Sequence, residues 1–314
     1  MSRVLNDNPN VSRTTRAKVE AAMKELGYRP NSTARALTTG KTGVLGVVVF
    51  DTFHYGPAKV LEGIGQVARD ADYAISVMPV RSADRRSVRQ AVDRLLLHAV
   101  DGLITIAPEE AMARALLDLP HRIPRVAVDA SFDSEVPVAA ADERGGASHA
   151  TEHLLQLGHR TVWHIAGPDG SFAARERCAG WREALERVGA DVPQPLVGDW
   201  EAESGYLLGR ELAARADVTA VFAANDFMAL GLLRALREAG RRVPEDVSVI
   251  GVDDIPEAAY LIPPLSTVRP DFVEAGRRCL ELLLEQMASG RNQSLHSVIP
   301  TQLIIRRTSA AAPH

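Results

Sequence analysis

The sequence predicts an α/β protein whose core contains two doubly wound parallel sheets. Short apolar runs rich in Val and Ile recur along the chain without in–out alternation, as in strands that are covered on both faces. Amphipathic stretches separate these runs, which is the pattern of repeated β–α units. The pattern occurs in two successive series within residues 43–306. We therefore expect two lobes with a cleft between them, preceded by a small all-α segment.

The all-α segment is expected within residues 1–28. Ser2–Leu5 has the character of the end of a helix. A second helix is predicted to begin after Ser12, which can cap it, and its apolar positions recur at helical spacing as far as Leu26. Gly27 is expected to end this helix as a C′ glycine.

Residues 29–42 are predicted to form a short helix and a linker. Pro30 keeps the preceding residue extended, and Asn31 can cap a helix over Ser32–Leu37. A helix of six or seven residues is well below the ~12–15 residues that an isolated helix needs in water. We therefore expect it to be disordered unless a partner stabilises it.

The two β–α series account for most of the remaining chain. The first consists of Val44–Phe50, Ala58–Ala71, Ala74–Val80, Asp84–Ala99, Gly102–Ile106, Met112–Leu119, Arg125–Val128 and Val136–Ala140. The second consists of Gly145–Leu157, Thr161–Ile165, Arg175–Val188, Glu203–Ala214, Ala220–Ala223, Met228–Ala239 and Ser248–Val252. A helix over Phe272–Ala288 and a final strand over Ser297–Ile304 follow.

The composition is that of a globular protein without membrane segments. Of its 314 residues, 46% are hydrophobic and 24% are charged. The longest apolar runs, such as Val44–Phe50, are far shorter than the ~20 residues that span a bilayer. The first residues lack the apolar core of an export signal. Cys178 and Cys279 lie in separate helical patterns, which favours free thiols and a reducing cytoplasm.

The net charge of −4 is unevenly distributed. Residues 1–42 contain eight Lys and Arg residues against three Asp and Glu residues, so the remainder of the chain is acidic. A basic arm on an acidic body suggests a polyanionic partner for the arm, such as nucleic acid. A solvated helix face explains the same charges about equally well.

Polar residues follow several of the predicted strands. In open α/β sheets, ligands bind beyond the carboxyl ends of the strands, and Asp142, Arg177, Asn225 and Asp253 all lie there. A guanidinium, an amide and carboxylates suit the hydroxyls of a sugar, and Trp200 or Phe272 could offer an aromatic face. Each residue taken alone is more often a helix cap or turn residue, so it is their convergence that favours a binding site.

Signatures of enzymes and metal sites are largely missing. The chain has no P-loop, no GxSxG and no HExxH. Gly63-Ile64-Gly65 lies inside a helical pattern rather than after a strand, so it is discounted as a nucleotide-binding motif. His149 and His153 have the spacing of a metal pair but lack a third ligand. Asp253-Asp254 could be a catalytic pair, but adjacent residues at a strand end diverge, and Asp254 is expected to cap the next turn.

Several ordered segments resemble the LacI/GalR family of bacterial transcriptional repressors over essentially the whole chain. They are Ser2–Asn6, Val11–Val19, Leu26–Leu37, Glu152–Arg160, Ala179–Trp181, Asn225–Gly231 and Gly251–Asp254. The first two resemble the end of the family's recognition helix and its third helix, and the next resembles its hinge. Gly198–Trp200, Ile262–Thr267 and Asp271-Phe272 extend the likeness to one sugar-responsive member.

The resemblance implies a periplasmic-binding-protein-like core with an N-subdomain of about 43–141 plus 272–299. The C-subdomain would comprise about 142–271 plus 300–306, and residues 307–314 would form a disordered tail. Arg177, Asn225 and Asp253 would hydrogen-bond a sugar effector, expected to be a galactoside or a related sugar. Three further residues would complete the pocket, namely Asp142, Trp200 and Phe272. Phe50 stands near the first strand end, where the likeness would place a serine, so a different sugar is also possible.

For DNA, the resemblance implies that a helix-turn-helix head reads an operator. Arg3 would contact a guanine, Leu37 would act as an apolar wedge in the minor groove, and Ala34 would pack beside it. Asn6, Ser12 and Asn31 are the other expected contacts. The family's head begins further upstream, so we expect the true start to precede Met1 and tight specific binding by the present chain to be in doubt.

The function expected from these residues is that of a cytoplasmic, sugar-responsive repressor without a cofactor. The segment after Arg306 lacks a heptad of leucines, so a homodimer is expected rather than a tetramer. An exported sugar-binding protein with the same two lobes is the alternative, and an upstream apolar leader would favour it. A sugar-active enzyme is a third hypothesis, but the sequence offers no nucleophile, acid–base pair or metal site for it.

Overall fold

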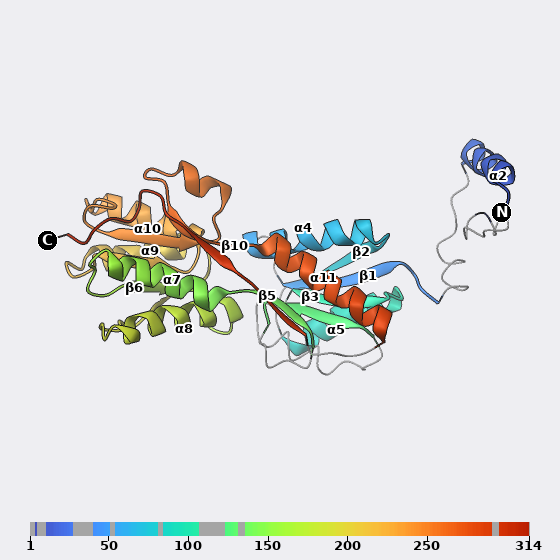
Figure 1. Ribbon diagram of the computed structural model, residues 1–314. Coiled ribbons are helices and arrows are strands. Elements are labelled where there is room, and N and C mark those ends of the chain that lie inside the picture. Colours follow the sequence, from blue (N-terminus) through green and yellow to red (C-terminus); the bar gives the residue numbers. More distant parts are fainter. Residues whose placement is uncertain are drawn as a thin grey trace.

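The computed structural model describes residues 4, 11–27, 40–50, 54–80, 84–106, 123–130, 136–290 and 295–313. Its body consists of two lobes, each built on a six-stranded sheet, and Figure 1 shows them side by side. This agrees with the α/β, two-lobed fold class predicted from the sequence. In the part of the chain so described, no helix is both long and apolar enough to cross a membrane.

The first sheet is entirely parallel, with the strand order β11-β5-β4-β3-β1-β2. Its strands are β1 (Val44–Phe50), β2 (Ala74–Val80), β3 (Gly102–Ile106), β4 (Arg125–Val128), β5 (Val138–Ala141) and β11 (His296–Ile299). Helices α4 (Tyr55–Asp70) and α11 (Phe272–Ser289) cover one face, and α5 (Arg85–Leu97) packs on the other.

Strand β1 explains why its sequence lacks alternation. Val47 and Val49 belong to the core under α4 and α11, whereas Val48 belongs to the core under α5. Since successive side chains point to opposite faces, both sets are buried and both are apolar.

The second sheet has the order β12-β10-β9-β8-β6-β7. Its strands are β6 (Trp163–Ala166), β7 (Leu196–Val197), β8 (Ala220–Ala223), β9 (Ser248–Val252), β10 (Ser266–Pro270) and β12 (Thr301–Ile304). Helices α7 (Glu143–Gln156) and α8 (Phe172–Arg187) cover one face, and α9 (Ala202–Ala213) and α10 (Asp226–Glu238) cover the other. A short 3₁₀ helix, η1 (Pro256–Tyr260), follows β9.

The end of the chain differs from the predicted single strand over Ser297–Ile304. Pro300 separates β11, which extends the first sheet in parallel, from β12, which pairs antiparallel with β10 in the second sheet. The second sheet is therefore mixed rather than purely parallel. The chain passes between the lobes after β5, after β10 and at Pro300.

Glycines allow pairs of helices to pack closely. A Cβ atom at Gly63 of α4 would lie 2.0 Å from the carbonyl oxygen of Val273, and one at Gly276 of α11 would lie 2.1 Å from that of Val60. Side chains at these positions would force the two helices apart. Gly63 thus has a packing role within a helix, which agrees with discounting Gly63-Ile64-Gly65 as a nucleotide motif.

The prediction of a disordered tail over 307–314 is wrong for residues 307–313. Thr308 is fully buried, accepts a hydrogen bond from the Ser266 amide at 2.8 Å and donates one to the Val249 carbonyl at 2.6 Å. The Ala312 amide donates to the carbonyl of Leu157 at 2.9 Å. These bonds satisfy backbone groups at the end of the second lobe, so the segment is held in place.

Near the N-terminus, α2 (Arg13–Glu25) has the predicted ends. The Ser12 hydroxyl accepts a hydrogen bond from the Thr15 amide at 3.2 Å as the N-cap, and Gly27 has a left-handed φ of 57°. The short hinge helix predicted over Ser32–Leu37 and the stretch Met112–Leu119 lie outside the described residues.

Candidate functional site

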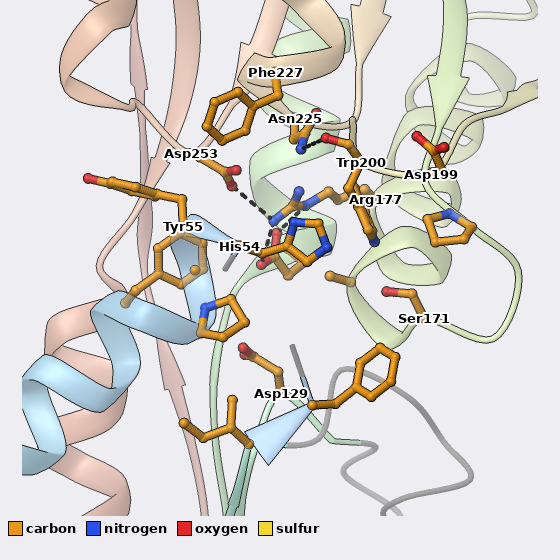
Figure 2. A pocket seen from close by; sticks show the side chains of 18 residues that line it. His54, Tyr55, Asp129, Ser171, Arg177, Asp199, Trp200, Asn225, Phe227 and Asp253 are labelled. Carbon is orange, nitrogen blue, oxygen red and sulfur yellow. Dashed lines mark hydrogen bonds and ion pairs between the residues drawn. The ribbon is translucent and has the colours of Figure 1, made fainter. Parts of the chain in front are cut away.

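A cavity of about 210 Å³ lies between the two lobes and is lined from both of them (Figure 2). The first lobe contributes Phe50, His54, Tyr55, Gly56, Pro57, Ile106, Asp129 and Phe272. The second lobe contributes Glu143, Pro168, Ser171, Ala173, Arg177, Asp199, Trp200, Asn225, Phe227 and Asp253. Most of these residues follow strands or begin helices, which is where ligands bind in parallel α/β sheets.

Arg177 lies at the centre of the polar wall, on the second turn of α8. Its Nε donates to Glu143 Oε2 at 2.6 Å and its Nη2 to Glu143 Oε1 at 3.0 Å, which is a bidentate pair. Nη1 donates to the carbonyl of Ala224, and Nη2 lies 3.6 Å from Asp253 Oδ1. The side chains of Arg177 and Glu143 are only 5% and 2% exposed, so this pair is strongly held.

Trp200 forms an aromatic wall beside this arginine. The guanidinium carbon of Arg177 lies 5.6 Å from the centre of the indole. Asn225 holds the backbone there: its Nδ2 donates to the Trp200 carbonyl at 2.9 Å, and its Oδ1 accepts from the Met228 amide at 2.8 Å as the cap of α10. An aromatic face next to polar groups suits a ligand with one apolar and several hydroxylated surfaces.

Asp253 follows β9 and projects into the cavity (Figure 2). Its φ of 111° is rare for a residue with a side chain and is a form of backbone strain that is common at functional sites. Burial raises the pKa of its carboxyl well above the usual 3.8, and the neighbouring Arg177 opposes this shift. The adjacent Asp254 points elsewhere and accepts hydrogen bonds from Arg269 and Arg306, both at 2.6 Å, rather than capping a turn as predicted.

Asp129 follows β4 on the opposite side of the cavity. Burial, followed by the nearby Glu143 carboxylate, raises its pKa to about 7, while Arg177 and a backbone hydrogen bond from Ala141 act in the other direction. Its Oδ1 is buried and has no hydrogen-bond partner within the described residues. A buried acceptor without a partner is costly, and a hydrogen-bond donor on a ligand in the cavity would satisfy it.

The first lobe supplies a largely apolar floor. The rings of Tyr55 and Phe272 meet edge to face with their centres 6.3 Å apart. Gly56 leaves room for this contact, because a Cβ atom there would lie 3.2 Å from the ring of Phe272. His54 precedes α4, and its Nδ1 lies 4.0 Å from the Glu201 carboxylate of the other lobe. The floor and the polar wall therefore come from different lobes, so a ligand in the cavity contacts both.

The structure brings together six of the seven residues predicted for an effector site: Arg177, Asn225, Asp253, Trp200, Phe272 and Phe50. The seventh, Asp142, does not line the cavity, because its carboxylate caps α7 by accepting from the Gly145 amide at 2.9 Å. The next residue, Glu143, takes the place at the cavity wall.

Sequence reasoning missed Glu143 and Asp129. Asp129 could have been found by the rule that identified the others, since it directly follows a predicted strand. Of the residues expected to contact DNA, Ser12 caps α2, and the remaining five, Arg3, Asn6, Asn31, Ala34 and Leu37, lie outside the described residues.

Metal binding has little support in this part of the chain. No group of three or more His, Cys, Asp and Glu side chains suited to a metal ion occurs among the residues that the structure describes. His153 instead forms a hydrogen bond of 3.3 Å with the hydroxyl of Ser309, and burial lowers its pKa.

A Gly167→Ala substitution tests the aromatic wall. A Cβ atom at Gly167 would lie 2.2 Å from the indole of Trp200, so the ring must shift toward the cavity or out of it. We expect the affinity for any ligand of the cavity to fall about 10-fold or more, which corresponds to about 1.4 kcal/mol, because the displaced indole no longer meets the ligand. Calorimetry measures the change.

Gly65→Ala in α4 is the matched control, since a Cβ atom there would meet no described atom within 4 Å. Combining Gly167→Ala with Trp200→Phe should restore part of the affinity, because a smaller ring fits beside the methyl group. An unchanged affinity in Gly167→Ala would mean that the indole does not shape the site.

Comparison with known proteins agrees with this architecture. Residues 1–31 match the family described as bacterial regulatory proteins, lacI family, and residues 151–309 match the periplasmic binding protein-like domain. The lactose operon repressor of Escherichia coli K12 is 34% identical over 313 residues, covering 99% of this chain and 87% of that protein. The transcriptional regulator CelR of Thermobifida fusca is 34% identical over 328 residues, covering 98% and 93%.

Solved structures show the same likeness in three dimensions. The Lac repressor dimer bound to operator and the anti-inducer ONPF superposes with a TM-score of 0.90 at 34% identity, covering 99% of this chain and 94% of that one. The CelR–cellobiose complex superposes with a TM-score of 0.78 at 32% identity, covering 98% and 94%. The curated relatives are transcriptional repressors or regulators rather than enzymes. The chain therefore belongs to the LacI family of bacterial regulatory proteins.

Proposed function

We propose that this regulator is a cytoplasmic, homodimeric repressor whose operator affinity is controlled by a small sugar bound between the lobes. The observation that carries the proposal is the cavity itself, which combines an indole wall with Arg177 and Asp253 and is lined from both lobes. Hydroxyl groups of a sugar can donate to carboxylates, and its C–H face can stack on an aromatic ring. The structures of relatives bound to ONPF or cellobiose support a glycoside or a similar sugar as the effector.

The arrangement of the cavity supplies a route for control. A sugar that contacts Trp200 in one lobe and Tyr55 in the other stabilises one relative placement of the lobes over the alternatives. The lobe containing Tyr55 is the one that residues 40–50 enter from the N-terminal segment. If the lobe placement also changes the spacing of the two hinges in a dimer, sugar and operator affect each other's affinity by the same factor.

Two measurements on the same protein test the proposal. A thermal-shift screen of galactosides, glucosides, cellobiose and pentosides should yield at least one sugar that raises the melting temperature. Fluorescence anisotropy with labelled DNA from the gene's own promoter region should then show an affinity that this sugar changes. No response to any sugar would contradict the proposal. Sugar binding without any DNA binding at low salt would favour a sugar-binding protein instead.

A further inference from the structure

We propose that the cavity accepts uncharged and amine-bearing sugars and rejects sugars that carry phosphate or carboxylate groups, and that Glu143 sets this selectivity. The inference rests on the proposed sugar-binding function and narrows the class of effector. It depends on three features of the cavity: the balance of charges along its wall, the occupied donors of Arg177, and the acceptors that face the open space.

Acidic groups outnumber basic ones along the described part of the wall. Asp129, Glu143, Asp199 and Asp253 carry carboxyl groups, whereas Arg177 carries the one guanidinium and His54 the one imidazole among those lining residues. Glu143 lies in buried surroundings, where screening by solvent is weak and charge repulsion is strong. A dianionic phosphate placed here would face the carboxylate of Glu143 at short range. Asp253 adds less repulsion, because burial opposes its charge. An ammonium group would be attracted to the Glu143 carboxylate.

Arg177 has little capacity left for an anionic ligand. Its Nε and Nη2 form the bidentate pair with Glu143, Nη2 also faces Asp253, and Nη1 donates to Ala224. A guanidinium offers five N–H donors in a fixed geometry, so most of them are used by the protein itself. A phosphate or carboxylate could form its own bidentate pair only by displacing Glu143, which would leave a buried carboxylate without its partner.

The unused groups of the wall are mainly acceptors. Asp129 Oδ1 is buried without a partner among the described residues, and the carboxylate of Asp253 meets Arg177 only at 3.6 Å. Hydroxyl and ammonium groups donate hydrogen bonds to such acceptors, whereas the oxygens of a phosphate dianion cannot. Burial raises the pKa of Asp129 to about 7 and the pKa of Asp253 well above its usual value, which favours their neutral acid forms. Asp199 lies on the same wall, and there the hydrogen bond with the Ser204 hydroxyl lowers the pKa of the carboxyl.

Glu143 controls both effects at once. Its carboxylate adds negative charge to the wall and holds Arg177 in a fixed position. Glutamine at this position has nearly the same size and still offers one oxygen to Arg177, but it carries no charge. A Glu143→Gln variant should therefore release donors of Arg177 and reduce the repulsion of anions together.

The test compares sugars that share a ring configuration and differ in one substituent, which is neutral, cationic or anionic. Galactose, galactosamine, galacturonate and galactose 6-phosphate form one series, and the corresponding glucose compounds form a second. Calorimetry at moderate salt should show that the uronate and phosphate bind at least about 10-fold more weakly than the neutral parent in the series that binds. The amine should bind at least as well as the parent. An anionic member that binds tightest would overturn the selectivity alone. No binding in either series, together with no response to any sugar in the thermal-shift screen, would overturn the proposed sugar-binding function as well.

Two variants test whether Glu143 causes the selectivity against anionic sugars. Glu143→Gln should raise the affinity for the anionic members relative to the neutral parent by about 10-fold or more. Asp199→Asn removes the same charge from an exposed position on the cavity wall, and should change the ratio in the same direction by a smaller factor.

Glu183→Gln is the matched control, because that carboxylate pairs with Arg144 on the surface, away from the cavity. It removes one negative charge from the same lobe and should leave the ratio unchanged. If Glu143→Gln and Glu183→Gln give the same ratio as the parent protein, Glu143 does not set the selectivity. If Glu143→Gln does not fold, the ratio measured in Asp199→Asn decides whether wall charge excludes anions.

Discussion

Replacing Arg177 by methionine is expected to lower the free energy of unfolding by about 3–5 kcal/mol. The substitution removes the partner of Glu143, whose side chain is only 2% exposed, and it also removes the donor to the Ala224 carbonyl. A buried carboxylate without a partner costs far more than the loss of an exposed ion pair, because it cannot be solvated. Urea unfolding at neutral pH measures the change.

A double-mutant cycle separates the lost pair from the lost side-chain volume. Glu143→Gln in the Arg177→Met background removes the unpaired charge, so the double variant should be more stable than Arg177→Met alone. The coupling energy between the two positions should be about 2 kcal/mol or more. A coupling close to zero would mean that water reaches the pair.

Arg144→Met is the matched control for this prediction. Arg144 also makes a bidentate contact with a glutamate, Glu183, but the two side chains are 51% and 42% exposed. Exposed pairs contribute about 0–1 kcal/mol, so this variant should change stability little. The contrast between two arginine–glutamate pairs in one lobe isolates the effect of burial. A similar loss in both variants would contradict it.

Much of the fold follows from the sequence because burial on both faces leaves a strong signal. Val44–Phe50 and Gly102–Ile106 have the same bounds in the prediction and in the structure, since both are largely apolar runs with an aspartate at one border, Asp51 after the first and Asp101 before the second. The antiparallel pairing of β12 cannot be predicted in this way. A run such as Ser297–Ile304 has the same composition whether it continues in one sheet or turns into another at Pro300.

Part of the site can be predicted from a single rule about the ends of strands. Polar residues that follow strands converge at a sheet edge, which identifies Arg177, Asn225 and Asp253. Asp142 obeys the same rule and still does not line the cavity. The backbone angles of a single residue decide whether its side chain caps a helix or faces the ligand. At Asp142, φ is −75° and ψ is 72°, and its carboxylate caps the helix by accepting from the Gly145 amide. Residue order alone does not encode that rotation.

The ordered segment 307–313 shows a second limit. Its residues are mostly small, and the segment lies at the end of the chain, where disorder is common. Thr308 is nevertheless buried because its hydroxyl bridges the Ser266 amide and the Val249 carbonyl of two neighbouring strands. These bonds are long-range contacts, about 40 and 60 residues apart along the chain, which local composition does not report.

Asp253→Asn is expected to abolish the response to the effector while leaving the fold at least as stable at about pH 8. Asparagine keeps the shape of the side chain but loses the charge and one of the two acceptor oxygens. The affinity for the effector should fall about 100-fold, which corresponds to about 2.7 kcal/mol, as measured by calorimetry. A variant that binds like the parent would remove Asp253 from the site.

The stability of the same variant should depend on pH in a defined direction. Burial raises the pKa of Asp253 above its value in the unfolded chain, so the native state binds this proton more tightly. The parent protein therefore loses stability as the pH rises from about 4 toward the raised pKa, and the asparagine variant lacks this loss. The difference in the free energy of unfolding should shift in favour of Asp253→Asn between about pH 5 and about pH 8.

Two further variants distinguish strain from chemistry. Asp253→Ala should lose the effector as well, and it should also be less stable than Asp253→Asn, because alanine lacks the polar side chain that helps a residue tolerate a φ of 111°. Asp254→Asn should behave in the opposite way. Its carboxylate accepts from Arg269 and Arg306 outside the cavity, so we expect a loss of about 1–3 kcal/mol in stability and an unchanged affinity.

Opposite results for Asp253 and Asp254 would show that the two carboxylates after β9 have different roles, one in ligand binding and one in stability. Removing the charge of a residue that stabilises the fold lowers the stability of the protein. Removing the charge of a buried residue that serves a ligand relieves an electrostatic cost, so the stability does not fall. Asp253 has the second character, since burial opposes its charge and its backbone is strained. If both asparagine variants instead lose stability to the same extent and keep their affinity, the strand end is purely structural and the ligand must be held elsewhere on the cavity wall.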